Sequence, residues 1–204
     1  MQKKAEKLAL GTAQFGLDYG ISNKSGRVKK SEIKKIINNA IEFNINTIDT
    51  AAGYGKSELE LGKFSNHLKN FFIFTKLRPL PKHTVDIEDW VNAEVESSLK
   101  RLNKRSIEGL LIHDSKQLLT NKGKEIFNAL ISLKNLNIIQ KIGVSVYHPE
   151  ELYSLIKNYN FDIVQLPFNI LDRRFLKTGW FQRLKDLGII IHSRSTFLQG
   201  LLLI

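Results

Sequence analysis

Residues with acid–base side chains stand at the ends of successive apolar runs in this sequence. Asp49, Lys76 and His113 each end or follow such a run, and Tyr54 lies in the glycine-containing segment after the first of them. Each of these residue types is also common at a strand end for structural reasons. An Asp can cap the next segment, a Lys can be solvated, and a His can be part of the core. Brought together at the same ends of neighbouring strands, the four would form a proton-donating site.

The four side chains suit the reduction of a carbonyl group. A free tyrosine has a pKa of about 10, too high for an efficient proton donor at neutral pH. An ammonium group beside a phenol favours the phenolate, and a carboxylate keeps a partly buried ammonium protonated. Lys76 and Asp49 would act in this way on Tyr54, and His113 would orient the carbonyl oxygen. Since no side chain carries hydride, a nicotinamide cofactor is implied.

The elements that must position these residues alternate between strand-like and helix-like patterns. Short apolar runs predict strands that are buried on both faces; they cover 7–11, 46–50, 71–75, 108–113, 141–146, 162–167 and 188–193. Between them, apolar residues recur at helical spacing, and Ser31 stands where it would cap the first helix. The apolar positions are Ile33, Ile36, Ile37, Ala40 and Ile41, then Val91, Val95, Leu99 and Leu102, then Ile126, Ala129, Leu130 and Leu133, then Leu152, Leu155 and Ile156, and finally Phe181, Leu184 and Leu187.

This alternation predicts an α/β fold built from right-handed strand–helix–strand units with a parallel sheet. Seven successive strands favour a (β/α)8 TIM barrel over an open doubly wound sheet, and no G-x-G-x-x-G motif follows the first strand. Active sites of such barrels lie at the C-terminal ends of the strands. We therefore expect Asp49, Lys76 and His113 to converge there.

At these residues the sequence resembles the aldo-keto reductase family, in particular a bacterial member. The segment TIDTAAGYG at 47–55, Thr75-Lys76 and Ile112-His113 are similar to the Asp/Tyr/Lys/His tetrad of that family in order and spacing. The resemblance runs through nearly the whole chain. It implies an NADPH-dependent reductase of an aldehyde or ketone, including sugar-like carbonyls, with Tyr54 as general acid, Lys76 and Asp49 tuning it, and His113 orienting the substrate.

The same resemblance implies residues that hold the cofactor. They are Gly11, Thr12, Ser145, Gln165 and Arg194. Two departures from the family fall here. Val146 stands where the family usually has Asn, and Arg194 replaces an aromatic residue that usually stacks on nicotinamide. A planar guanidinium can also stack on a ring, although it adds charge.

A third departure is the length of 204 residues, compared with about 250 for a typical (β/α)8 barrel. The predicted elements account for about seven strands and lack the last helix, strand and helix. We therefore expect residues 1–204 to form a single barrel domain that is truncated at its C-terminus. The lacking part normally carries most of the adenosine-phosphate contacts in this family, which puts activity in doubt. An open barrel edge would also allow self-association.

The amino-acid composition indicates which binding partners and which cellular compartment to expect. The net charge of +11 comes from scattered Lys and Arg residues, which favours solvated helix faces over a nucleic-acid partner. The chain has no Cys, which excludes disulfides and Cys-based zinc sites, and we expect no metal site. No apolar run reaches the ~18–20 residues of a membrane span, and the apolar stretch near the basic N-terminus is too short for a signal peptide. These features predict a cytoplasmic protein that binds a small-molecule carbonyl substrate, without nucleic-acid or membrane partners.

Two other functions stay open at this point. One is a catalytically inactive barrel remnant that binds a ligand or a partner protein. The other is a Schiff-base aldolase with Lys76 as the nucleophile. The Asp49–Tyr54 pattern disfavours the aldolase.

Overall fold

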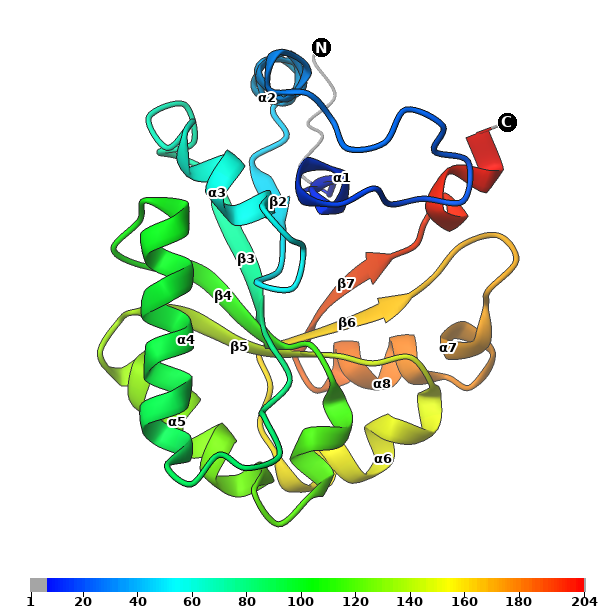
Figure 1. The fold of residues 1–204 in the computed structure, drawn as a ribbon. Helices are drawn as coiled ribbons and strands as arrows, with labels where there is room; N and C mark the ends of the chain where they lie inside the picture. The colour runs from blue at the N-terminus through cyan, green and yellow to red at the C-terminus, as the bar shows by residue number, and fades with distance from the viewer. Residues whose placement is uncertain (1–6, 204) are drawn as a thin grey trace.

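The computed structural model describes residues 7–203 and contains a parallel sheet of seven strands paired in chain order from β1 to β7. The strands are β1 (Ala9–Gly11), β2 (Thr47–Asp49), β3 (Phe72–Leu77), β4 (Ile107–Ile112), β5 (Ile139–Ser145), β6 (Ile163–Pro167) and β7 (Ile190–Arg194). The sheet curls as an incomplete (β/α)8 barrel (Figure 1), which confirms the predicted fold class. The first six residues, with most of the basic N-terminal segment, and Ile204 lie outside the described residues.

Helices α4, α5, α6 and α8 lie on the outer side of the curled sheet (Figure 1). The helices are α1 (Ala13–Gly16), α2 (Lys30–Glu42), α3 (Ser57–Gly62), α4 (Ile87–Leu102), α5 (Gly123–Asn135), α6 (Pro149–Asn158), α7 (Arg174–Lys177) and α8 (Trp180–Asp186), with 3-10 segments η1 (Ser115–Leu119) and η2 (Leu198–Leu203). The prediction that Ser31 caps the first long helix is wrong. Helix α2 begins at Lys30 with Lys29 as its N-cap, so Ser31 already lies in the first helical turn, and no side chain caps this end.

The core lies between the sheet and these helices. Ile33, Ile37 and Ala40 of α2 are buried, as their spacing predicts, and the predicted apolar face of α5 is buried in full. Ile41 and Leu187 are exposed, however. Inside the curl of the sheet, a smaller cluster forms from Phe74, Leu111 and Ile163. The helical period therefore identifies the buried face correctly but overestimates its width.

The two outer strands of the sheet, β1 and β7, each pair with one neighbour among residues 7–203. Ile190 in β7 is exposed, and so are Leu201, Leu202 and Leu203 in η2. Within the same residues, no helix has the length and apolar character needed to cross a membrane.

Candidate active site

A buried ion pair joins the ends of β2 and β3. The Lys76 ammonium donates to both carboxylate oxygens of Asp49, at 2.8 and 2.9 Å, and to the Thr50 carbonyl at 2.9 Å. The Lys76 side chain is 1% exposed, and that of Asp49 is 20% exposed. A charge this deeply buried needs paired and hydrogen-bonded partners. The carboxylate and the carbonyl provide these partners for Lys76.

The same ammonium reaches the tyrosine that the sequence singles out. Lys76 Nζ lies 3.4 Å from Tyr54 Oη, and 4.9 Å from the centre of the Tyr54 ring. The His113 ring, which directly follows β4, packs edge-on against Tyr54 with 5.8 Å between ring centres. The structure thus brings together all four residues expected to act on the substrate: Asp49, Tyr54, Lys76 and His113.

Buried hydroxyl groups hold the loop that carries Tyr54. The Ser57 hydroxyl at the start of α3 donates to the Thr12 carbonyl at 2.8 Å and lies 3.0 Å from the Thr50 hydroxyl. The Thr12 hydroxyl donates to the Asp49 carbonyl at 3.0 Å. These contacts fasten both ends of the 50–57 loop to the strand ends. Sequence reasoning did not find Ser57, because a lone serine at the start of a short helix carries no distinguishing pattern.

Helix α1 packs so closely against this loop that Gly16 has no room for a side chain. An added Cβ would lie 1.8 Å from the Tyr54 carbonyl oxygen and 2.4 Å from the Ser57 nitrogen. We expect Gly16→Ala to lower the free energy of unfolding by about 1–3 kcal/mol through overpacking, and to displace Tyr54. Gly11→Ala is the matched control, because its Cβ would meet no heavy atom within 4 Å. Urea unfolding measures both, and equal midpoints for the two variants would contradict the prediction.

Asp49, Tyr54 and His113 line a cavity of about 230 Å³ at the C-terminal ends of the strands, whereas the buried Lys76 does not line it. Of the residues predicted to hold the cofactor, Thr12, Ser145, Gln165 and Arg194 line it, whereas Gly11 lies in β1 and does not. Tyr19 and Tyr147 also line it, and the sequence did not single them out. Tyr147 follows the β5 end by two residues, which was an available signal; Tyr19 lies in a loop and carried none.

Two polar atoms beside this cavity are buried without a hydrogen-bond partner in the described part of the chain: Gln165 Oε1 and Arg194 Nε. Gln165 Nε2 donates to Asp49 Oδ1 at 2.8 Å, so the amide oxygen is the free acceptor. Arg194 Nη2 donates to the Val146 carbonyl at 3.2 Å, and its guanidinium lies 4.0 Å from the centre of the Tyr147 ring. An unpaired acceptor and an unpaired donor fit a ligand with both functions, such as a carboxamide.

His113 is neutral at physiological pH. Burial lowers the pKa of its imidazole to about 4, and the Lys76 ammonium acts in the same direction. A neutral imidazole keeps one N–H donor, which a carbonyl oxygen in the cavity can accept. The side chain can therefore orient a carbonyl without adding a positive charge to the site.

The depressed pKa of His113 predicts a loss of stability in acid. Unfolded chains protonate histidine near pH 6.5, but folded His113 resists until about pH 4, so the unfolded state binds more protons in this window. Stability is therefore fully present above pH 6.5 and falls as the pH drops toward 4. Urea unfolding between pH 7.5 and 4.5 should show a smaller decline for His113→Gln than for the wild type. The exposed His83→Gln control should follow the wild type, and parallel curves for all three proteins would contradict the assignment.

The chain matches the model of one known protein family. The model of the Aldo/keto reductase family matches residues 7–203. The uncharacterized oxidoreductase YqkF of Bacillus subtilis is 26% identical over 208 residues, which cover 96% of this chain and 66% of that protein. The chain thus spans slightly less than two thirds of this relative.

Solved structures agree with the family match. A Pseudomonas aeruginosa protein assigned to the aldo-keto reductases has a TM-score of 0.77 at 26% identity, with 93% of this chain and 73% of that chain covered. A Bombyx mori aldo-keto reductase in complex with NADP has a TM-score of 0.69 at 24% identity, with 93% and 62% covered. The second likeness concerns the fold alone.

Proposed function

Because the chain belongs to the aldo-keto reductase family, we propose that it reduces an aldehyde or ketone with NADPH. One observation carries the proposal: the buried Lys76 ammonium lies between the Asp49 carboxylate, at 2.8 Å, and the Tyr54 hydroxyl, at 3.4 Å. A fixed positive charge beside a phenol stabilises the negative charge that remains when the phenol donates its proton. This is the property that a proton donor to a carbonyl oxygen needs.

Each of the four side chains has a separate role in the proposed reaction. When bound, the nicotinamide supplies the hydride, which no side chain can provide. Tyr54 donates its proton to the substrate oxygen as negative charge develops there. Lys76 stabilises the phenolate that remains, Asp49 holds Lys76 in place, and the neutral His113 donates a hydrogen bond that orients the carbonyl.

The proposed cofactor site lies along the ends of β5, β6 and β7. Ser145, Gln165 and Arg194 line the cavity there, and the unpaired Gln165 Oε1 and Arg194 Nε can accept from and donate to the nicotinamide carboxamide. Thr12 lines the same cavity, and Gly11 would act only through the backbone that places Thr12. The buried Val146, where the family usually has Asn, offers the carboxamide no side-chain hydrogen bond.

The contacts of Lys76 disfavour the aldolase alternative. A Schiff-base lysine must present a neutral amine with a free lone pair to its substrate. Lys76 instead donates to the Asp49 carboxylate and the Thr50 carbonyl, and its side chain is almost fully buried. Reduction therefore remains the function that the geometry supports best.

NADPH binding and consumption test the proposal on the full chain. We expect NADPH to bind, seen as fluorescence quenching, and to be oxidised with at least one member of a panel of aldehydes, ketones and sugars. Gln165→Leu should weaken NADPH binding, and Gln182→Leu on the exposed face of α8 should not. Binding without oxidation of NADPH would favour the inactive remnant, and absence of both would overturn the proposal for this chain.

A further inference from the structure

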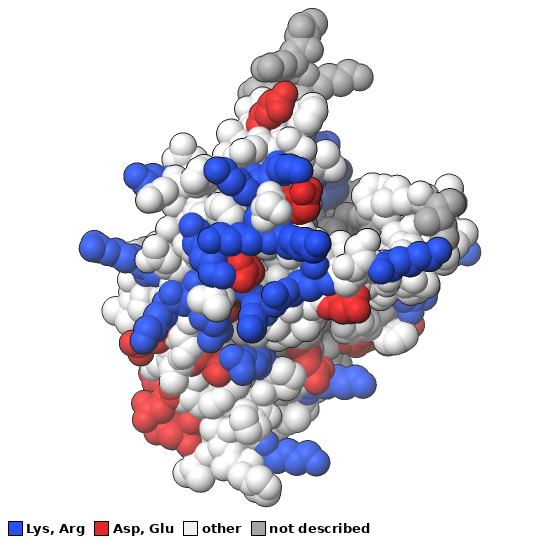
Figure 2. All heavy atoms as spheres, turned by 45° about the horizontal axis from the view of Figure 1, so that its top comes forward, with Lys and Arg blue, Asp and Glu red and all other residues white. Residues whose placement is uncertain are grey.

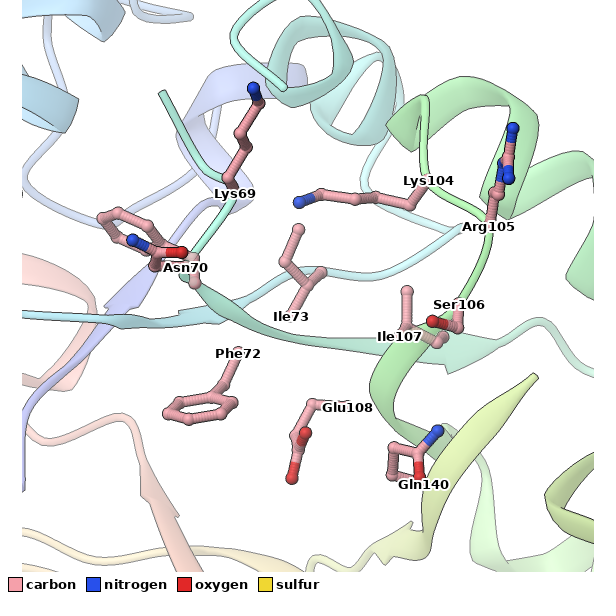
Figure 3. A pocket seen from close by; sticks show the side chains of 11 residues that line it. Lys69, Asn70, Phe72, Ile73, Lys104, Arg105, Ser106, Ile107, Glu108 and Gln140 are labelled. Carbon is pink, nitrogen blue, oxygen red and sulfur yellow. The ribbon is translucent and has the colours of Figure 1, made fainter. Parts of the chain in front are cut away.

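A second cavity, of about 530 Å³, lies at the opposite ends of the strands from the proposed active site. Its walls come from the loop after α3, the loop after α4, and the first residues of β3, β4 and β5 (Figure 3). The proposed reduction uses none of these residues. We propose that this cavity binds a small organic phosphate, with cationic side chains on the phosphate and an aromatic ring against the organic part.

Three cations line the cavity: Lys69, Lys104 and Arg105. Within residues 7–203, none of them forms an ion pair with a carboxylate. Glu108 is the one acidic residue of the lining, and Lys141 already neutralises it. The cavity therefore carries an uncompensated positive charge, which an anion of two or more charges can balance.

The central cation is held in place before any ligand arrives. Lys104 Nζ donates to the Leu68 carbonyl at 2.8 Å, which draws the side chain across the cavity (Figure 3). Its backbone N–H donates to the Leu99 carbonyl at 3.0 Å, and the preceding Asn103 donates from its side chain to the Ser65 hydroxyl at 2.9 Å. Burial lowers the pKa of the Lys104 ammonium, so its charge is costly without an anion nearby. A bound phosphate would relieve that cost.

The size and the neutral lining favour a phosphate with an organic group over a bare ion. The cavity of about 530 Å³ is far larger than one phosphate group needs. Phe72 in its wall is 47% exposed, so its ring is open to a ligand. Asn70, Ser106 and Gln140 add neutral hydrogen-bonding groups to the lining of the cavity. A nucleotide combines the required parts, since its base can stack on the ring while its phosphates meet the cations.

The charge of the whole molecule would assist such a ligand. The net charge is +11, and Figure 2 shows Lys and Arg side chains gathered on the face that comes forward when the top of Figure 1 is tilted toward the viewer. A field of one sign raises the local concentration of oppositely charged ligands and their association rate. Basic residues that are scattered along the sequence thus lie together on one face of the folded protein.

Calorimetric titration of the full chain with ADP, inorganic phosphate and adenosine tests the proposal. We expect ADP to bind more tightly than either inorganic phosphate or adenosine. Loss of one charge-assisted contact should weaken ADP binding about tenfold in Lys69→Gln and in Arg105→Gln. The exposed Lys157→Gln on α6 is the matched control and should leave ADP binding unchanged. Arg194→Gln separates the two cavities, because only ADP bound at the active-site end would respond to it.

Several outcomes would overturn the proposal. One is ADP binding that Arg194→Gln weakens and that Lys69→Gln and Arg105→Gln leave intact, which would place ADP in the other cavity. Equal affinity for adenosine and ADP would remove the role of the phosphate, and absence of ADP binding would remove the site. Lys104→Gln is the more direct variant but also loses the bond to Leu68, so Lys69 and Arg105, which are exposed, carry the test.

Discussion

Tyr54→Phe is expected to lower the rate of carbonyl reduction about 10²–10⁴-fold, the range that a general acid contributes. The substitution removes the hydroxyl that lies 3.4 Å from Lys76 Nζ and leaves the ring packed against His113. Because the proposed reaction places this hydroxyl at the substrate oxygen and not at the proposed carboxamide site, NADPH binding should stay within about twofold of the wild type. Steady-state assays of kcat and fluorescence titration of NADPH give the two readouts.

The controls for this prediction are other tyrosines. Tyr153→Phe on the exposed face of α6 should leave the rate unchanged. Tyr19 and Tyr147 are a stricter comparison, because both line the same cavity as Tyr54. Neither makes a hydrogen bond with Lys76 in the described residues, so we expect neither Phe variant to lose more than about tenfold. A larger loss in Tyr147→Phe than in Tyr54→Phe would show that the proton donor is misassigned.

The sequence predicts the strands, and the proximity of the side chains at their ends, because both depend on short-range signals. A strand buried on both faces is mostly apolar, so Ile163–Pro167, in which Gln165 is the one polar residue, stands out from the more polar segments beside it. Polar residues directly after such runs then fall at the same edge of a parallel sheet by topology alone. This places Asp49, Lys76 and His113 together without knowledge of any long-range contact.

Long-range contacts account for what the sequence does not predict. Gly16 and Tyr54 are far apart in the chain, and their close approach follows from the packing of α1 on the loop before α3. Gly11, in β1, does not line the cavity that its neighbour Thr12 lines, and periodicity cannot resolve a difference of one residue. The basic cavity is hidden for the same reason, since Lys69 and Lys104 line it together although they come from separate loops, after α3 and after α4.

Lys76→Met is the second variant with a large expected effect, on both stability and activity. It leaves Asp49 with Gln165 as its remaining side-chain donor among the described residues. Removing one partner of a fully buried ion pair costs about 3–5 kcal/mol, and the 20% exposure of Asp49 should reduce this to roughly 2–3 kcal/mol of unfolding free energy. Carbonyl reduction should also fall at least about a hundredfold, because the Tyr54 hydroxyl loses its neighbouring positive charge.

A double variant separates these two effects. In Lys76→Met with Asp49→Asn, no unpaired carboxylate remains beside the cavity, so much of the lost unfolding free energy should return. The rate should not return, because the double variant still lacks the ammonium beside Tyr54. Urea unfolding and NADPH oxidation on the four proteins of this cycle measure both terms. If the rate recovered together with stability, Lys76 would act only by holding the strand ends in place, and the direct contact with Tyr54 would carry no part of the proposed chemistry.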